Sequence, residues 1–150
     1  MRALSVRQPW SWAIVAGGKD CENRSRNIAG GHRGLVAIHA GVQLADADAF
    51  RRVAELADYG VPDLGRPGAP AETALGAVVG VAELTGAHPA SSCHGGCSPW
   101  ADPTGWHLRL VKPRPLSRPV DCPGRLGLFT LPADVAALVL RQAAEAVTRR

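Results

Sequence analysis

A lysine, a glutamate and an arginine lie close together in the sequence at Lys19, Glu22 and Arg24. Lys19 is one of only two lysines in a chain that otherwise uses arginine for its positive charge. Lysine offers a compact ammonium group that can release its proton when it is buried, which a guanidinium group cannot do. We therefore expect a buried cation beside a buried anion in this segment. The alternative is a surface turn with an exposed ion pair, which contributes little to stability.

Side chains suited to binding a nucleobase precede this segment at Arg7, Gln8 and Trp10. Unpaired bases are held by stacking on aromatic rings, while amides and charged groups read the base edge or the phosphate. We expect Gln8 to read the base and Trp10 to supply the stacking surface. The alternative for Trp10 is a position in the core. Trp12 lies two residues further along the same helix, so the two tryptophans cannot both face the cleft, and we expect Trp12 at the surface or in the core.

The elements that position these residues can be predicted from apolar periodicity and from glycine and proline. Strands are expected at residues 3–6, 35–40, 75–84, 106–111 and 126–131, and helices after Pro9, at residues 44–59 and at residues 132–148. Gly76 and Gly80 indicate a bend or a close backbone approach within their strand. Loops are expected at 61–72 and 85–105, and prolines at 113, 115 and 119 predict a crossing without central pairing. This pattern is typical of an α+β fold, a partly open barrel with flanking helices.

Five blocks in this order resemble the ASCH domain, whose signature is G-x-K-x-x-E-x-R. They are SVRQPW (5–10), GGKDCENR (17–24), LVAIHA (35–40), PRPL (113–116) and LGLF (126–129). The resemblance covers about residues 3–132, so we expect a single ASCH domain over residues 1–150. It implies a small PUA-like β-barrel with a cleft that takes RNA, single-stranded DNA or a modified nucleoside.

The resemblance also implies an alternative, a hydrolase. In relatives that remove the acyl group from N4-acetylcytidine, the lysine of the signature is catalytic, and a threonine stands where this chain has Glu22. By that analogy Lys19 would act as base or nucleophile with Glu22 beside it, on a modified cytidine or as a ribonuclease. A carboxylate in place of a hydroxyl keeps an ammonium charged and in place, so we expect binding rather than turnover.

Further ligand contacts are implied by the aromatic-histidine segment that begins the strand lining the cleft in ASCH relatives. His107 is then expected to face the ligand, with Trp100 lying over it as a lid. His39, at the end of an apolar strand, is likewise expected to contact the ligand. The alternative for His39 is a hydrogen-bonded core residue.

Cys93 and Cys97 lie in a glycine-rich segment and could bind zinc together with a histidine and the distant Cys122. The sequence offers no second close pair of cysteines or histidines that would complete a standard zinc ribbon. We therefore expect reduced thiols, and neither a metal nor a cofactor.

Length and net charge are consistent with a single domain that binds a short nucleic-acid ligand. The 150 residues, 46% of them hydrophobic, can bury one sizeable core. The sequence shows no run of 18 apolar residues and no charged stretch followed by an apolar segment near residue 1, so we expect neither a membrane span nor a signal peptide, and a cytoplasmic protein with no membrane partner. A net charge of +4 fits a few phosphates better than a long duplex, although it would also serve solubility alone.

Overall fold

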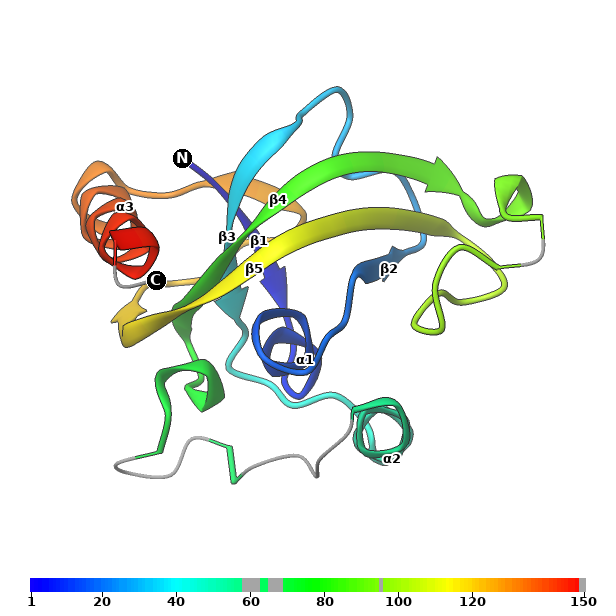
Figure 1. Cartoon of the computed structure of the whole chain (residues 1–150), viewed down its shortest axis with the longest axis horizontal. Coiled ribbons are helices and arrows are strands. Elements are labelled where there is room, and N and C mark those ends of the chain that lie inside the picture. The colour runs from blue at the N-terminus through cyan, green and yellow to red at the C-terminus, as the bar shows by residue number, and fades with distance from the viewer. Residues whose placement is uncertain (58–62, 65–68, 95, 149–150) are drawn as a thin grey trace.

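The computed structural model describes residues 1–57, 63–64, 69–94 and 96–148. Its centre is one curled, mixed sheet of six strands in the order β2-β5-β4-β3-β1-β6 (Figure 1). The strands are β1 (Arg2–Val6), β2 (Cys21–Arg24), β3 (Gly34–Ala40), β4 (Ala77–Pro89), β5 (Trp106–Asp121) and β6 (Leu128–Thr130). β1 and β3 run parallel, and the other neighbours are antiparallel.

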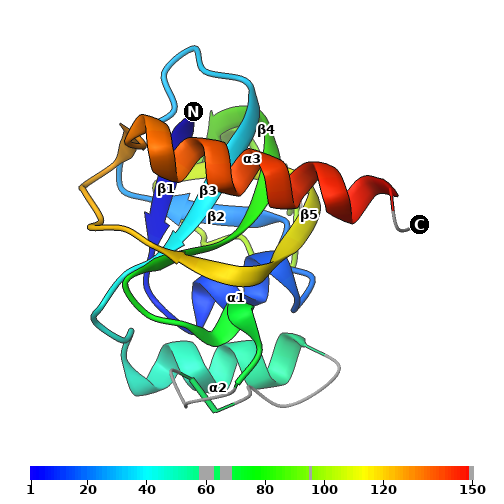
Figure 2. The same ribbon diagram turned by 90° about the vertical axis from the view of Figure 1, so that its left-hand side faces the viewer.

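Helices lie on both faces of this sheet (Figure 2). The α-helices are α1 (Trp10–Val15), α2 (Ala47–Leu56) and α3 (Ala133–Thr148), and short 3-10 turns form at η1 (Ala71–Thr73) and η2 (Ala90–Ser92). No helix within the described ranges is long and apolar enough to cross a membrane. The α+β architecture expected from the sequence is thus confirmed.

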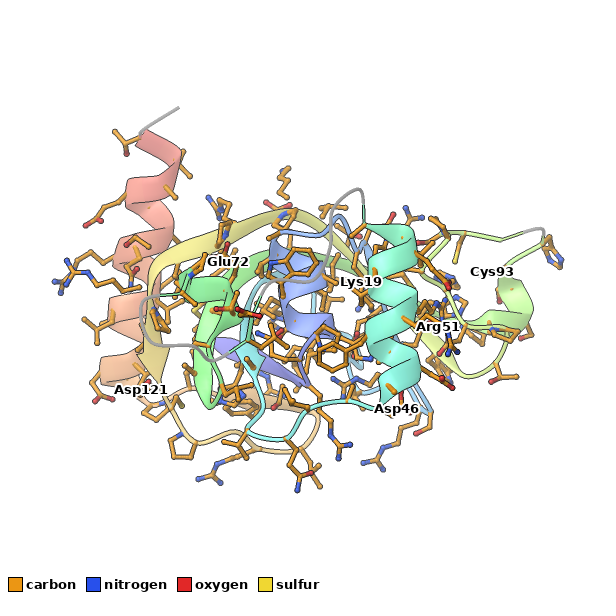
Figure 3. All side chains as sticks on the ribbon, turned by 90° about the horizontal axis from the view of Figure 1, so that it is seen from below. Lys19, Asp46, Arg51, Glu72, Cys93 and Asp121 are labelled. Carbon is orange, nitrogen blue, oxygen red and sulfur yellow. The ribbon has the colours of Figure 1, made fainter. Side chains whose placement is uncertain are left out.

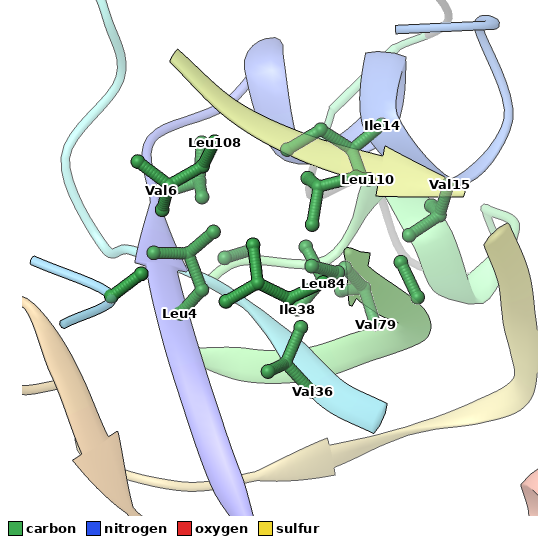
Figure 4. Close-up of a cluster of buried hydrophobic side chains, with 13 residues drawn as sticks. Leu4, Val6, Ile14, Val15, Val36, Ile38, Val79, Leu84, Leu108 and Leu110 are labelled. Carbon is green, nitrogen blue, oxygen red and sulfur yellow. The ribbon is translucent and has the colours of Figure 1, made fainter. Parts of the chain in front are cut away.

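The period-2 alternation of the strands divides the core into two layers. On one face, Ile14 and Val15 of α1 pack against Leu4, Val36 and Ile38 (Figure 4). On the other face, α3 packs against the intervening strand residues through Ala136, Val139 and Ala143. The sheet is therefore buried on both sides, which fixes the backbone of the strands that carry the site.

α2 packs on the outer side of α1. Val53 of α2 lies in a cluster with Trp12, Cys21 and Trp100. The helix begins after Asp46, whose Oδ1 accepts a hydrogen bond of 2.9 Å from the backbone N–H of Ala49. The helix expected at 44–59 is shorter in the structure, because it begins at Ala47 and ends at Leu56, after which Ala57 is extended. Tyr59 and half of the loop expected at 61–72 lie outside the described residues.

The close backbone approach predicted at Gly80 is confirmed. A Cβ atom there would overlap the Val15 side chain and the carbonyl group of Arg114. Glycine therefore lets α1 sit directly on β4.

The predicted crossing is wrong, because β5 continues as a strand through Pro113, Pro115 and Pro119 to Asp121, but the predicted absence of central pairing at these prolines is confirmed. β2 pairs with β5 only over residues 106–109, so one edge of β5 beyond Arg109 has no partner strand. Proline is tolerated where the missing N–H would face an open edge. Bulges between β4 and β5 also absorb the irregular pairing.

The loop predicted at 85–105 is shorter in the structure, because β4 runs on to Pro89. The remaining connection leads from η2 to β5.

Candidate functional site

Three side chains of alternating charge form a row of ion pairs that leads from the segment after α1 to the floor of the candidate site. Lys19 Nζ lies 2.7 Å from Glu22 Oε2, and Glu22 Oε1 lies 3.2 Å from Arg24 Nε. Arg24 Nη2 donates a hydrogen bond of 2.6 Å to the carbonyl group of Ser5. Glu22 is thereby fixed between two cations and can change its orientation only by breaking both contacts.

Local backbone structure brings these residues together. α1 is followed by Gly18, whose φ of 80° reverses the chain, and the N–H of Lys19 donates to the carbonyl group of Ala13 at 2.9 Å. β2 then pairs with β5, and Glu22 and Arg24 lie on one face of β2 because side chains alternate along a strand. Lys19 reaches Glu22 from just outside this strand.

Lys19 itself faces the protein interior. Its side chain is 2% exposed, and Nζ donates to the backbone carbonyl group of Cys21 as well as to Glu22. The Trp10 ring lies 5.4 Å from the ammonium group at its centroid, within range of a cation–π interaction. The buried cation–anion pair expected from the sequence is therefore present, and the carboxylate is the member that reaches the surface.

A cleft of about 790 Å³ opens above Glu22. It lies at the carboxyl ends of the parallel strands β1 and β3, and its walls are β2, the segment 41–46, α2 and the segment 124–127. The structure places five of the sequence-predicted site residues on this cleft: Arg7, Trp10, Glu22, Arg24 and His39.

Gln8 is not among the residues that line the cleft, because its amide is fully used by the backbone. Its Oε1 accepts from the N–H of Trp12 at 2.9 Å, and its Nε2 donates to the carbonyl groups of Glu72 at 2.8 Å and Ala74 at 3.1 Å. The side chain is completely buried. Gln8 thus joins the start of α1 to η1, and we do not include it among the ligand contacts.

Trp100 and His107 also lie away from the cleft. Trp100 is buried and packs edge-on against Trp10, with ring centroids 6.5 Å apart. His107 is buried and lies beside His88, Cys93 and Cys97. Trp100 therefore supports the Trp10 ring from behind instead of closing over a ligand, and His107 belongs to a separate group of side chains.

Two arginines that the sequence analysis did not single out also line the cleft, Arg52 and Arg125. Arg52 forms an ion pair with Asp102. Arg125 is exposed, as is Arg7, and neither has an ion-pair partner in the part of the chain that the structure describes. The polar face of the predicted helix at 44–59 could have indicated Arg52, but nothing in the sequence pattern links Arg125 to the site.

His39 forms two hydrogen bonds on the wall of the cleft. Nε2 lies 2.7 Å from the carbonyl oxygen of Cys122, and Nδ1 lies 3.0 Å from Ser5 Oγ. Because a carbonyl group can only accept, Nε2 carries the proton and Nδ1 accepts from the serine hydroxyl. Burial lowers the pKa of His39 below its ordinary value of 6.5, although the bond to Cys122 opposes this. His39 is thus a neutral side chain at pH 7.

The structure excludes Cys21 as a reactive thiolate near the site. Burial raises the pKa of the Cys21 thiol to about 12, despite the opposing effect of Lys19. A thiol in this state is a poor nucleophile at neutral pH. Cys21 contributes to the packing between α1 and α2.

The lowered pKa of His39 predicts how stability depends on pH. The unfolded chain binds more protons than the folded protein around pH 6.5, so this contribution is present above pH 6.5 and is lost as pH falls toward the folded pKa. We expect the free energy of unfolding to decrease on acidification, and to decrease less in His39→Gln. Urea titrations at several pH values measure this.

The exposed His94 provides the control for the pH experiment. His94→Gln should keep the pH dependence of the wild type. His88 also has a lowered pKa and contributes to the pH dependence of the wild type. The contribution of His39 is therefore the difference in the free energy of unfolding between wild type and His39→Gln, followed as a function of pH. Parallel curves for these two proteins would contradict the assignment.

Comparison with solved structures identifies the fold. ASCH from Zymomonas mobilis matches with a TM-score of 0.54 and 13% sequence identity over 93% of each chain. A tyrosine-to-phenylalanine mutant of ASCH from the same organism matches with a TM-score of 0.53 and 15% identity, over 93% of this chain and 96% of that one. No protein-family model and no curated protein matches the sequence.

The chain therefore has the fold of these ASCH structures, an α+β architecture. The resemblance inferred from the five sequence blocks is confirmed at the level of the fold.

Proposed function

We propose that this protein binds RNA, single-stranded DNA or a modified nucleoside in the cleft above Glu22. The observation that carries the proposal is the Glu22 carboxylate, which is held by Lys19 and Arg24 on the floor of the cleft beside the half-buried Trp10 ring. The ASCH-domain fold, with its G-x-K-x-x-E-x-R signature at residues 17–24, supports the same function.

The carboxylate of Glu22 suits the edge of an unpaired base. A carboxylate accepts hydrogen bonds from exocyclic amino groups, as acidic side chains do from cytosine N4. Such groups are free in a single strand, whereas base pairing occupies them in a duplex. Because Lys19 and Arg24 already fix Glu22, little conformational freedom would be lost on binding.

Trp10 provides a stacking surface next to that acceptor. The ring is partly exposed on the cleft, and the buried Trp100 ring packs against it in a T-shaped arrangement. Stacking on an aromatic ring tolerates any base, because every base has a π-face. Trp10 would therefore contribute affinity, while Glu22 would select bases that can donate.

Phosphates would bind at the rim of the cleft. Arg7 and Arg125 are exposed there without ion-pair partners among the described residues, whereas Asp46 and Asp48 line another part of the wall. These acidic residues limit how far a negatively charged backbone can extend. The volume of about 790 Å³ is also in the range of small-ligand sites, so a ligand of one or a few nucleotides fits best.

The hydrolase alternative requires Lys19 to act on the substrate. The ammonium group, however, donates to the Cys21 carbonyl group and to Glu22, and its side chain is 2% exposed. A substrate in the cleft would meet Glu22 before Lys19. This arrangement favours binding over turnover.

We expect short single strands to bind more tightly than a duplex of the same sequence, because stacking and edge recognition need unpaired bases. Fluorescence anisotropy with labelled RNA and DNA oligomers measures this preference. If the rim neutralises about two or three phosphates, log K should fall with log salt with a slope of about −1.4 to −2. Preference for the duplex, or a slope equivalent to many phosphates, would contradict the proposal.

Two arginine variants test which residues contact phosphate, and one incubation tests for hydrolysis. Arg125→Ala should make the salt slope shallower by about 0.7, whereas Arg33→Ala, which removes an exposed arginine that does not line the cleft, should leave it unchanged. Incubation with N4-acetylcytidine, followed by chromatography, should leave the nucleoside intact. Catalytic release of cytidine would establish the hydrolase instead.

A further inference from the structure

A group of two histidines and two cysteines lies where β4 leads into the connection to β5. His88 and His107 are directly opposite each other in the ladder between these strands, and the connection brings Cys93 and Cys97 back over them. Figure 3 shows Cys93 at the end of the molecule opposite α3. One ligand atom from each of the four residues lies within 4.8 Å of all the others.

The distances within this group are those of a compact donor set. Cys93 Sγ lies 2.9 Å from His88 Nε2, 3.0 Å from Cys97 Sγ and 3.2 Å from His107 Nδ1. Cys97 Sγ lies 3.3 Å from His107 Nδ1. In tetrahedral zinc sites, bond lengths of about 2.3 Å to sulfur and 2.0–2.1 Å to nitrogen place neighbouring ligand atoms roughly 3.3–3.8 Å apart. A shift of less than about 1 Å at each of these contacts would therefore open the centre to a zinc ion.

The surroundings of His107 are those of a metal ligand. The ring is buried, and Nε2 lies 2.7 Å from the carbonyl oxygen of Asp102. Since that carbonyl group can only accept, Nε2 carries the proton, and Nδ1 presents its lone pair to the two sulfur atoms. Histidines that bind metals commonly donate their second N–H to a backbone carbonyl group, which fixes the ring orientation.

We propose that His88, Cys93, Cys97 and His107 bind one zinc ion. Two sulfur and two nitrogen ligands in a tetrahedral arrangement favour zinc among the common metals. Two thiolates neutralise the charge of the ion, so the site needs no further anion. Four protein ligands leave no open position, and the site is therefore structural instead of catalytic.

This ligand set differs from the one considered on sequence grounds and replaces the expectation of reduced thiols. Cys122 lies elsewhere, and its carbonyl group accepts the hydrogen bond from His39. His88 and His107 take the remaining positions, because strand pairing brings them together across the connection between β4 and β5.

The site would fix the segment that supports the cleft from behind. Asn23, on β2 next to Glu22, donates to the carbonyl group of Trp100 at 2.9 Å and accepts from the N–H of Asp102 at 2.8 Å. Trp100 in turn packs against Trp10. Zinc would thus hold this segment in place without contacting the ligand, and the proposal does not depend on what the cleft binds.

Metal analysis of the protein, purified under reducing conditions without added metal or chelator, tests the proposal. We expect one zinc ion per chain by inductively coupled plasma mass spectrometry. Cys93→Ser and Cys97→Ser should lose the metal. His94→Asn is the matched control and should retain it, because His94 lies between the two cysteines in sequence but is exposed and outside the donor group.

Cobalt substitution tests the coordination geometry without relying on a variant that folds. Metal-free wild-type protein titrated with Co²⁺ should develop the d–d and thiolate charge-transfer bands of a tetrahedral site, with an end point at one equivalent. A chelator should lower the melting temperature of the wild type and leave that of Cys93→Ser unchanged. Wild-type protein that lacks zinc and gives no such spectrum, or that contains a disulfide between Cys93 and Cys97, would overturn the proposal.

Discussion

Lys19→Ala is expected to lower the free energy of unfolding by about 3–5 kcal/mol, as removal of one partner from a buried ion pair does. The substitution leaves the Glu22 carboxylate, whose side chain is 9% exposed, with Arg24 alone. It also removes the donor to the carbonyl group of Cys21. Urea denaturation followed by circular dichroism measures the loss.

The other lysine of the chain provides the control. Lys112 is 73% exposed and pairs with Glu83 at 3.2 Å on the surface, so Lys112→Ala should cost about 1 kcal/mol or less. Equal losses in the two variants would contradict the structural role of Lys19. The double variant Lys19→Met/Glu22→Leu should recover part of the stability, because apolar groups can replace a buried ion pair. It should nevertheless fail to bind nucleic acid, which separates folding from function.

Trp10→Ala is expected to weaken binding of single-stranded oligonucleotides by about 1–3 kcal/mol, which is roughly a 5- to 150-fold increase in Kd. The partly exposed ring is the proposed stacking surface on the cleft, and no other tryptophan lines the cleft among the described residues. Trp10→Phe keeps an aromatic face and should retain most of the affinity. Fluorescence anisotropy with a short labelled RNA measures both effects.

Trp12 provides the comparison for stability. Its side chain is buried in the cluster between α1 and α2, so Trp12→Ala should cost about 3–5 kcal/mol, clearly more than Trp10→Ala. If Trp10→Ala instead destabilises the protein as much and leaves the affinity per folded molecule unchanged, Trp10 is a core residue and the stacking role is wrong.

Local patterns of the sequence predict most of the sheet and the centre of the site. The continuous apolar run of β3, the largely apolar β1 and the glycine at position 80 are physical requirements of a curled sheet that is buried on both faces. The charges at Lys19, Glu22 and Arg24 come together because they lie within one short segment. Contacts of this kind depend on neighbours in the chain, so they can be inferred from spacing alone.

Long-range partners could not be predicted in the same way. Gln8 has the side chain of a base-reading residue, but the carbonyl groups that bind it, at Glu72 and Ala74, are more than sixty residues away. His88 fell in a predicted loop, so its pairing with His107 across the extended β4 was not recognised.

The C-terminal helix shows a further limit of periodicity. By helical spacing Leu138 shares an apolar face with Val135 and Val139, yet it is 45% exposed, whereas the small side chain of Ala136 is buried against the sheet. Periodicity alone does not define which sector of a helix meets the sheet.

The position of β1 in the sheet affects how the protein folds during synthesis. β1 is made before the other strands, yet it lies between β3 and β6, with Arg2 opposite both Val36 and Thr130. Its second edge stays open until residues 128–130 have left the ribosome. Nascent chains that stop short of β6 therefore carry an unpaired, apolar strand edge. Such chains are suited to capture by chaperones and vulnerable to aggregation.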